Sequence, residues 1–301
     1  MNRRRFMEVM AALSASPMVS RAQGSGPLTK AIPSSAERIP IIGMGTWQTF
    51  DVGRSAGGRA RLRPVLQEFF DRGGKIIDSS PMYGSSEPVL GALLPQISPR
   101  REPFSASKVW IYGKRLGAIQ IESSRKAWGI PRFDLLEVHN LLDWEAHLET
   151  LRAMKSSGRL RYVGVTTSHG RRHDELEEIM RREPLDFVQL TYNLADRSVE
   201  DRLLPLARER KIAVITNRPL DGGALFGRVR GKPLPAWAAE ADIHNWAQFF
   251  LKFVVSHPAV TCAIPATSQL AHMKENMGAG EGRLPDAAFR RRMAQYFDGA
   301  L

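Results

Sequence analysis

The chain has 301 residues, 43% of them apolar and 25% charged, a composition typical of a soluble globular protein with one large α/β domain or two small ones. Its single cysteine, Cys262, excludes an intramolecular disulfide and a cysteine-based metal site. The formal net charge is +12, but basic and acidic residues are interleaved and no groove-reading motif is present, so no nucleic-acid partner is expected.

Residues 1–22 resemble a twin-arginine export signal. Residues 3–6 read Arg-Arg-Arg-Phe, a short, weakly apolar run covers 9–19, and residues 20–22 (Ser-Arg-Ala) offer a cleavage site. This run is shorter than the ~20 residues of a membrane-spanning helix, so no stable membrane insertion is expected. The predicted location is periplasmic or exported, through the twin-arginine machinery, and cytoplasmic if the segment is only a basic tail. Cleavage would remove four arginines and one glutamate, which lowers the net charge from +12 to +9.

Residues 23–40 are a predicted linker that ends in a small hairpin near Ile32 and Ile39. Beyond it, short apolar strands alternate with segments of helical periodicity. The predicted strands cover 41–47, 75–79, 104–110, 134–139, 162–167, 187–192, 213–216 and 261–264. The predicted helices cover 62–71, 87–94, 115–128, 144–157, 172–182, 201–210, 243–256, 270–277 and 285–296, with a Gly/Pro-rich insertion over 221–235.

Eight strands that alternate with helices predict a single (β/α)8 barrel over residues 41–301, because such alternation gives parallel strands and eight of them close a barrel. The competing architecture, a doubly wound open sheet, requires a glycine-rich phosphate-binding turn after an early strand. The candidate turn at residues 43–48 reads Gly-Met-Gly-Thr-Trp-Gln and lacks the last glycine, which disfavours the open sheet.

Four polar residues lie at or near the carboxyl ends of predicted strands. The second strand stops at Asp78, the Ser/Pro/Gly turn after it carries Tyr83, Lys108 lies late in the third strand, and His139 ends the fourth. Each alone has a structural explanation as a cap, a packing residue, a rim lysine or a hydrogen-bonded histidine. Because the carboxyl ends of barrel strands open on one face, the four together predict a proton-transfer site.

Reduction of a carbonyl group is the chemistry that needs this set. The Lys108 ammonium is expected to lower the pKa of Tyr83 from its usual value of about 10, and Asp78 is expected to hold that ammonium charged and oriented. His139 would donate a hydrogen bond to the carbonyl oxygen while Tyr83 delivers a proton. The set contains no hydride source, so a redox cofactor must be supplied.

The pattern Gly73-x4-Asp78-x4-Tyr83-Gly84, followed by Lys108 and His139, resembles the Asp-Tyr-Lys-His tetrad of the aldo/keto reductase superfamily of (β/α)8 barrels, and the similarity runs from about residue 41 to 276. The resemblance implies these four as the catalytic set. It also implies a nicotinamide cofactor, held by Gly45, Thr46, Trp47, Asp78, Thr166, Gln189, Asn217, Arg218, Pro219, Leu220, Gly222, Ile264, Pro265, Ala266, Thr267, His272, Glu275 and Asn276.

Three departures from the family pattern bear on the cofactor. Thr166 and Thr167 stand where many members have a Ser-Asn pair, and Asn217 stands where an aromatic residue often stacks on the nicotinamide ring. Ala266 and His272 replace a frequent Lys and Arg that bind the 2′-phosphate. A phosphate depends on charge-assisted hydrogen bonds, so NADP(H) is favoured only narrowly and NAD(H) remains possible.

The predicted substrate is a small-molecule aldehyde or ketone of apolar or aromatic character. Its pocket is predicted from Trp47, Met82, Tyr83, Trp110, His139 and Leu141. One alternative is a non-catalytic barrel that binds a nicotinamide nucleotide as a sensor or binds a partner, although such a barrel needs no proton donor. A metal-dependent hydrolase is a third alternative, disfavoured because only His139 of seven histidines ends a predicted strand, so no metal is expected.

Overall fold

The computed structural model describes residues 26–300, and the predicted leader over residues 1–22 lies outside them. Eight strands form one sheet in the spatial order β10-β9-β8-β7-β6-β5-β4-β3, with every neighbouring pair parallel. These strands are β3 (Met44–Gly45), β4 (Ile76–Asp78), β5 (Phe104–Val109), β6 (Phe133–His139), β7 (Leu160–Thr166), β8 (Phe187–Thr191), β9 (Ala213–Asn217) and β10 (Val260–Ala263).

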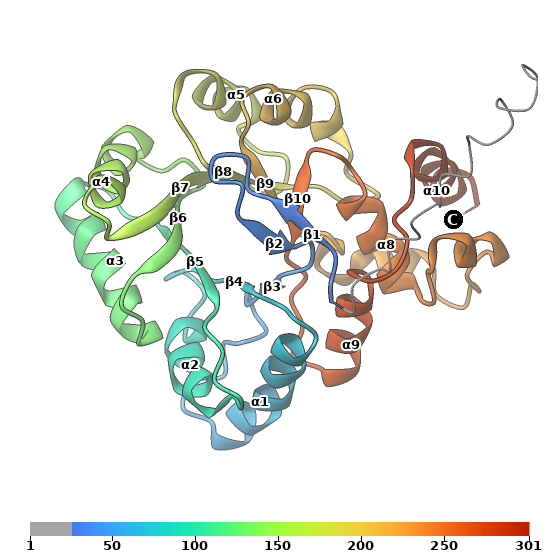
Figure 1. Ribbon diagram of the computed structural model, residues 1–301, viewed down its shortest axis with the longest axis horizontal. Coiled ribbons are helices and arrows are strands. Elements are labelled where there is room, and N and C mark those ends of the chain that lie inside the picture. The colour runs from blue at the N-terminus through green and yellow to red at the C-terminus, as the bar shows by residue number, and fades with distance from the viewer. Residues whose placement is uncertain (1–25, 301) are drawn as a thin grey trace, which may run out of the picture.

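Helices connect the strands and surround them (Figure 1). They are α1 (Ala56–Asp71), α2 (Ser86–Leu93), α3 (Lys114–Trp128), α4 (Trp144–Ser156), α5 (His173–Arg182), α6 (Leu203–Glu209), α8 (Trp246–Val255) and α9 (Leu270–Gly278), with a short α7 (Ala224–Arg228) before α8 and α10 (Ala287–Ala300) at the end. Their apolar faces and the outward residues of the strands form the main hydrophobic core. Within residues 26–300, none of these helices has the length and apolar character needed to cross a bilayer.

Backbone hydrogen bonds between residues 41–43, just before β3, and Ala263 of β10 join the two ends of the sheet. The N–H of Gly43 donates to the carbonyl oxygen of Ala263 at 2.8 Å, and that of Ala263 donates to Ile41 at 2.9 Å. Gly45 is needed for this approach, because a Cβ there would lie 2.8 Å from the carbonyl oxygen of Ile264. The predicted (β/α)8 barrel is therefore confirmed.

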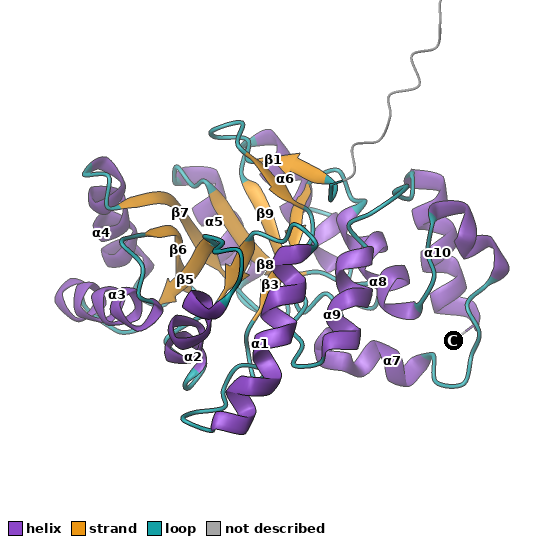
Figure 2. Ribbon diagram, turned by 60° about the horizontal axis from the view of Figure 1, so that its bottom comes forward, coloured by secondary structure: helices purple, strands orange, loops and turns teal. Residues whose placement is uncertain are grey.

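The predicted N-terminal hairpin is present as antiparallel β1 (Thr29–Ala31) and β2 (Arg38–Pro40). It lies across the end of the barrel where the strands begin (Figures 1 and 2). Glu37 of the hairpin accepts a hydrogen bond from the hydroxyl of Tyr162 at 2.8 Å and is ion-paired with Arg161, both from the start of β7. The hairpin thus covers the amino-terminal end, and the opposite end carries the open cavity.

Candidate active site

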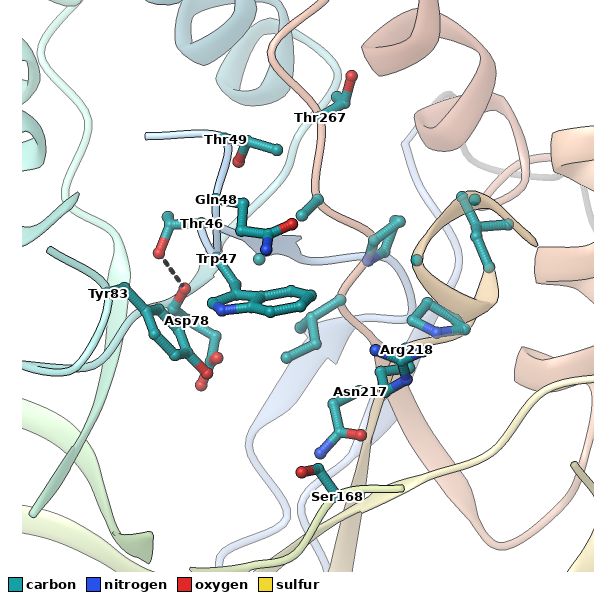
Figure 3. A pocket seen from close by; sticks show the side chains of 18 of the residues that line it. Thr46, Trp47, Gln48, Thr49, Asp78, Tyr83, Ser168, Asn217, Arg218 and Thr267 are labelled. Atoms are coloured by element: carbon teal, nitrogen blue, oxygen red, sulfur yellow. Dashed lines mark hydrogen bonds between the residues drawn. The ribbon is translucent and has the colours of Figure 1, made fainter. Parts of the chain in front are cut away.

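A cavity of about 790 Å³ opens where the strands end. Figure 3 shows part of its wall, with Asp78 and Tyr83 on one side of Trp47 and Asn217 and Arg218 on the other. Every residue predicted to contact the cofactor lines it, and so do Met82, Tyr83, Trp110 and His139. Phe226 lines the cavity as well, and so do residues that the sequence prediction did not assign, namely Gln48, Thr49, Asn140, Ser168, His169, Gly223 and Ala247. Apart from Ala247 in α8, the unassigned residues lie in loops and turns, where periodicity carries no signal.

Lys108 lies behind the cavity wall and is completely buried. Its Nζ donates to both carboxylate oxygens of Asp78 at 2.7 Å and to the carbonyl oxygen of Ser79 at 2.8 Å. Burial alone would lower the pKa of Lys108, but the surrounding acidic groups, Asp78 first among them, together outweigh burial and raise that pKa above its ordinary value. The ammonium therefore stays charged, 5.4 Å from the centre of the Tyr83 ring.

The half-buried Tyr83 presents its phenol between Lys108 and the cavity. Burial raises the pKa of Tyr83 above its usual value, and the attraction of Lys108 opposes this rise without overcoming it. The expectation that Lys108 would lower this pKa overall is therefore wrong for this structure, because burial outweighs the attraction and the charge of Asp78 adds to the rise. A neutral phenol is also the form that can give up a proton.

His139 ends β6 with its ring edge-on to Tyr83, the ring centres 6.1 Å apart. Burial, helped by the nearby charge of Lys108, lowers the pKa of His139 to about 3, so the imidazole is neutral at ordinary pH. Its Nδ1 lies 3.2 Å from Oγ of Ser80, which already accepts from the backbone N–H of Met82. The Ser80 hydroxyl can donate to Nδ1, and in that arrangement the imidazole carries its proton on Nε2.

A second buried carboxyl group belongs to the same network. Nε2 of Gln189 donates to Asp78 at 3.0 Å and to Oε2 of Glu137 at 2.9 Å. Glu137 is fully buried, and its Oε1 has no hydrogen-bond partner among the described residues. The sequence prediction missed Glu137 because it lies inside a strand, but strand alternation places it on the same face as His139, two residues away.

The predicted pyrophosphate region centres on Asn217 and Arg218. Nδ2 of Asn217 donates to the carbonyl oxygen of Thr167 at 2.8 Å, so its amide is fixed at the cavity wall. Arg218 is ion-paired with Asp221 at 2.7 Å and also lines the cavity. His272 is exposed on α9, next to Glu275 in the cavity lining.

Leu141 requires a correction. It was predicted to line the substrate pocket, but it is only 1% exposed, belongs to the hydrophobic core and is absent from the cavity lining. After β6 the chain passes through two residues with left-handed backbone, Asn140 and Leu141, and the turn directs the leucine inward. Asn140 lines the cavity in its place. No group of three His, Cys, Asp or Glu side chains is arranged for a metal ion within residues 26–300.

Comparison with known proteins gives one family model, described as the aldo/keto reductase family, which matches residues 41–294. A similar curated protein is the NADH-specific methylglyoxal reductase of Escherichia coli, 26% identical over 262 residues, which cover 75% of this chain and 78% of that protein. Another is the aldo-keto reductase YhdN of Bacillus subtilis, 26% identical over 205 residues, 62% of this chain and 60% of that protein.

Solved structures share the fold. An aldo-keto reductase from Klebsiella pneumoniae in complex with NADPH superposes with a TM-score of 0.72 at 24% identity, and the match covers 90% of this chain and 95% of that one. The aldo-keto reductase AKR11C1 from Bacillus halodurans superposes with a TM-score of 0.73 at 19% identity, and covers 90% and 96%.

Proposed function

The chain belongs to the aldo/keto reductase family, and from this premise we propose that it reduces an aldehyde or a ketone to an alcohol, with a hydride from NAD(P)H and a proton from Tyr83. The observation that carries the proposal is the convergence of Tyr83 and His139 on one cavity, with the Lys108–Asp78 pair directly behind the phenol. Membership in the family makes the chain an NAD(P)H-dependent oxidoreductase, and the tetrad geometry supports the choice of a carbonyl substrate.

The cavity fits a nicotinamide dinucleotide. Next to the tetrad, the hydroxyl and amide groups of Thr166, Gln189 and Asn217 suit a carboxamide, and Arg218 supplies a cation for a pyrophosphate. Because the Klebsiella pneumoniae structure contains NADPH and the Escherichia coli relative is named NADH-specific, NADP(H) is favoured and NAD(H) possible. When bound, the nicotinamide would supply the hydride.

Each tetrad residue has a separate task in the proposed reaction. His139 donates from Nε2 to the carbonyl oxygen and orients the substrate. Tyr83 gives its phenolic proton to that oxygen as the carbonyl carbon gains the hydride, which leaves an alcohol and a tyrosinate. Lys108 stabilises the tyrosinate until the proton is replaced from solvent, and Asp78 keeps Lys108 charged in a fully buried position.

The mouth of the cavity favours an apolar or aromatic substrate. Four large apolar side chains of the lining remain well exposed, between 37% and 44%: Trp47, Met82, Trp110 and Phe226. Removal of exposed aromatic and thioether groups from water by a bound ligand is favourable, because it buries apolar surface. We expect aromatic aldehydes and ketones to bind better than small hydrophilic ones.

Replacement of Tyr83 by Phe tests the proposal, because it deletes the acid and keeps the ring. The purified protein is assayed for oxidation of NADPH and of NADH with an aromatic aldehyde, and Tyr83→Phe is expected to lose at least about 100-fold in kcat, the usual contribution of a general acid. Tyr112→Phe is the matched control, since Tyr112 is 70% exposed and outside the cavity lining. Tight nucleotide binding without turnover in the parent would favour the non-catalytic sensor instead.

A further inference from the structure

The side chain of Glu137 occupies a space inside the barrel that a glycine on the neighbouring strand leaves open. It pairs in register with Lys108 on β5 and with Gly164 on β7. A Cβ at position 164 would lie 3.1 Å from Cγ of Glu137, so the glycine leaves space for the glutamate side chain. A carboxyl group is thereby held without access to solvent on the strand next to Lys108, near enough for the charge of Lys108 to act on it.

The single hydrogen bond of Glu137 leaves an ionised carboxylate poorly compensated in its buried position. Gln189 donates to Oε2, while the buried Oε1 accepts from no described residue. An ionised carboxylate needs donors on both oxygens to offset the cost of its burial. Burial raises the pKa of Glu137 well above its ordinary value, the charge of Lys108 opposes the rise, and the charge of Asp78 adds to it.

Building on the proposed reductase chemistry, we propose that Glu137 is a positioning residue that keeps Tyr83 a proton donor at alkaline pH by releasing its own proton beside Lys108. A protonated Glu137 leaves the charge of Lys108 balanced by Asp78 alone. As the pH rises, Glu137 ionises and its negative charge counters Lys108. A tyrosinate is then harder to form, so Tyr83 remains protonated over a wider range of pH.

The charged groups that face Glu137 are few and come from two strands. Lys108 on β5 and Asp78 on β4 are the two charges that act on it, whereas β7 contributes Gly164 and β8 contributes the neutral amide of Gln189. Both charges also act on Tyr83, as does Glu137 itself. A change at Glu137 is therefore expected to appear in the titration of Tyr83.

The pH dependence of kcat/KM in Glu137→Gln tests the proposal, because glutamine has the same shape, still accepts from Gln189 and never ionises. Near neutral pH the variant is expected to stay within about threefold of the parent, and the alkaline decline in kcat/KM is expected to begin about one pH unit lower. Glu87→Gln is the matched control: Glu87 is also buried, but it accepts from Ser107, Ser124 and Trp128 away from the tetrad, and the decline is expected to stay in place.

Infrared spectroscopy supplies a readout that needs no turnover. At neutral pH the parent and Glu87→Gln are expected to show the carbonyl band of a buried neutral carboxylic acid, and Glu137→Gln to lack it. A parent without this band, or a Glu137→Gln variant whose alkaline decline is unmoved, overturns the proposal even if the protein is a reductase. Conversely, a protein that shows the band but reduces no carbonyl compound contradicts the proposed reductase function. Failure of the Glu137 proposal and failure of the proposed function can therefore be told apart. If Glu137→Gln does not fold, Glu137→Asp is tested instead, because aspartate keeps an ionisable carboxyl group at this position. The proposal is contradicted if Glu137→Asp loses activity at alkaline pH to the same degree as a variant of the catalytic tetrad.

Discussion

We infer that the hydroxyl of Ser80 sets which nitrogen of His139 carries the imidazole proton. Ser80 accepts from the N–H of Met82 at 3.2 Å, so its single hydrogen can go to Nδ1 of His139. The imidazole then carries its proton on Nε2, where it can donate to a carbonyl oxygen. Because the pKa of His139 is lowered to about 3, the neutral ring has no second proton, and the choice of nitrogen determines whether it can donate at all.

We therefore expect Ser80→Ala to lower kcat/KM by about threefold to tenfold, the equivalent of one hydrogen bond of roughly 0.5–1.5 kcal/mol. The nitrogen chemical shifts of labelled histidine should show a mixture of tautomers in the variant and one tautomer in the parent. Ser80→Thr retains the hydroxyl and serves as the control. Equal kcat/KM and equal tautomer populations in all three proteins would contradict this role.

At the residue scale, a site residue can be predicted from the sequence where it ends a strand. Asp78 and His139 are the last residues of β4 and β6, and their convergence follows from the barrel. Glu137 could not be recognised in the same way, because its importance depends on space left by Gly164. Leu141 was misplaced because its inward turn depends on two left-handed backbone positions, which the sequence does not mark with glycine.

At the element scale, Lys252 ties α8 to two segments outside the barrel wall. Its fully buried Nζ donates to the carbonyl oxygens of Ala241 at 2.8 Å, Asp242 at 3.1 Å and Arg283 at 3.0 Å. Burial lowers the pKa of Lys252 to about 8, even though Asp242 acts in the opposite direction. The helix thus holds the loop before it and the segment that leads into α10 through one ammonium group.

Lys252→Met is expected to lower the free energy of unfolding by about 2–4 kcal/mol at pH 7, because three carbonyl oxygens lose their donor. The difference from the parent should also grow between pH 8 and pH 10. In that window the unfolded lysine, with its ordinary pKa of 10.5, holds a proton that the folded lysine, with a pKa of about 8, has released, so the parent gains stability as the pH rises.

Denaturant unfolding of the parent and of Lys252→Met at pH 7, 8 and 10 measures the difference in their free energies of unfolding. Lys126→Met is the control, because the side chain of Lys126 is 71% exposed and its ion pair with Glu122 lies on the surface of α3. It is expected to change the unfolding free energy by less than about 0.5 kcal/mol. A parent and Lys252→Met that differ by the same amount at pH 8 and pH 10 would show that this lysine does not titrate in the window.

The boundaries of some elements could not be read from periodicity. Helix α1 begins at Ala56, six residues before the predicted start at 62, because Ser55 caps it by accepting from the N–H of Gly58 at 3.0 Å. The glycines and arginines of its first turns hide the apolar stripe. The insertion over 221–235 was predicted without regular structure, yet it contains α7, whose Phe226 lines the cavity. Tertiary contacts, rather than local propensity, stabilise so short a helix.

On the scale of the whole molecule, one end of the barrel is closed by packing and the opposite end carries the candidate active site. The hairpin covers the end where the strands begin, and the cavity opens at the end where they finish. The alternation of eight strands and helices is enough to predict this division, because all parallel strands of a barrel point the same way. The detailed shape of the cavity could not be predicted, since loops of different lengths contribute its wall.

The twin-arginine pattern at the start of the chain bears on where the molecule works. The twin-arginine route carries folded proteins, so we propose that this chain folds, binds its cofactor and is exported as a complete enzyme. A fold with one cysteine needs no oxidation after export. In a bacterium with this route, the parent is expected in the periplasmic fraction, shortened after Ala22 and with nucleotide bound.

Arg3→Lys combined with Arg4→Lys distinguishes a true signal from a basic tail, because the change keeps every positive charge and removes the arginine pair. The double variant is expected to remain in the cytoplasm at full length, with its reductase activity intact. Arg21→Lys, which alters an arginine outside the pair, is the control and should be exported like the parent. If the parent protein stays uncleaved in the cytoplasm, the export proposal is contradicted. The reductase assignment would stand, because the tetrad and the cavity lie entirely within residues 45–276.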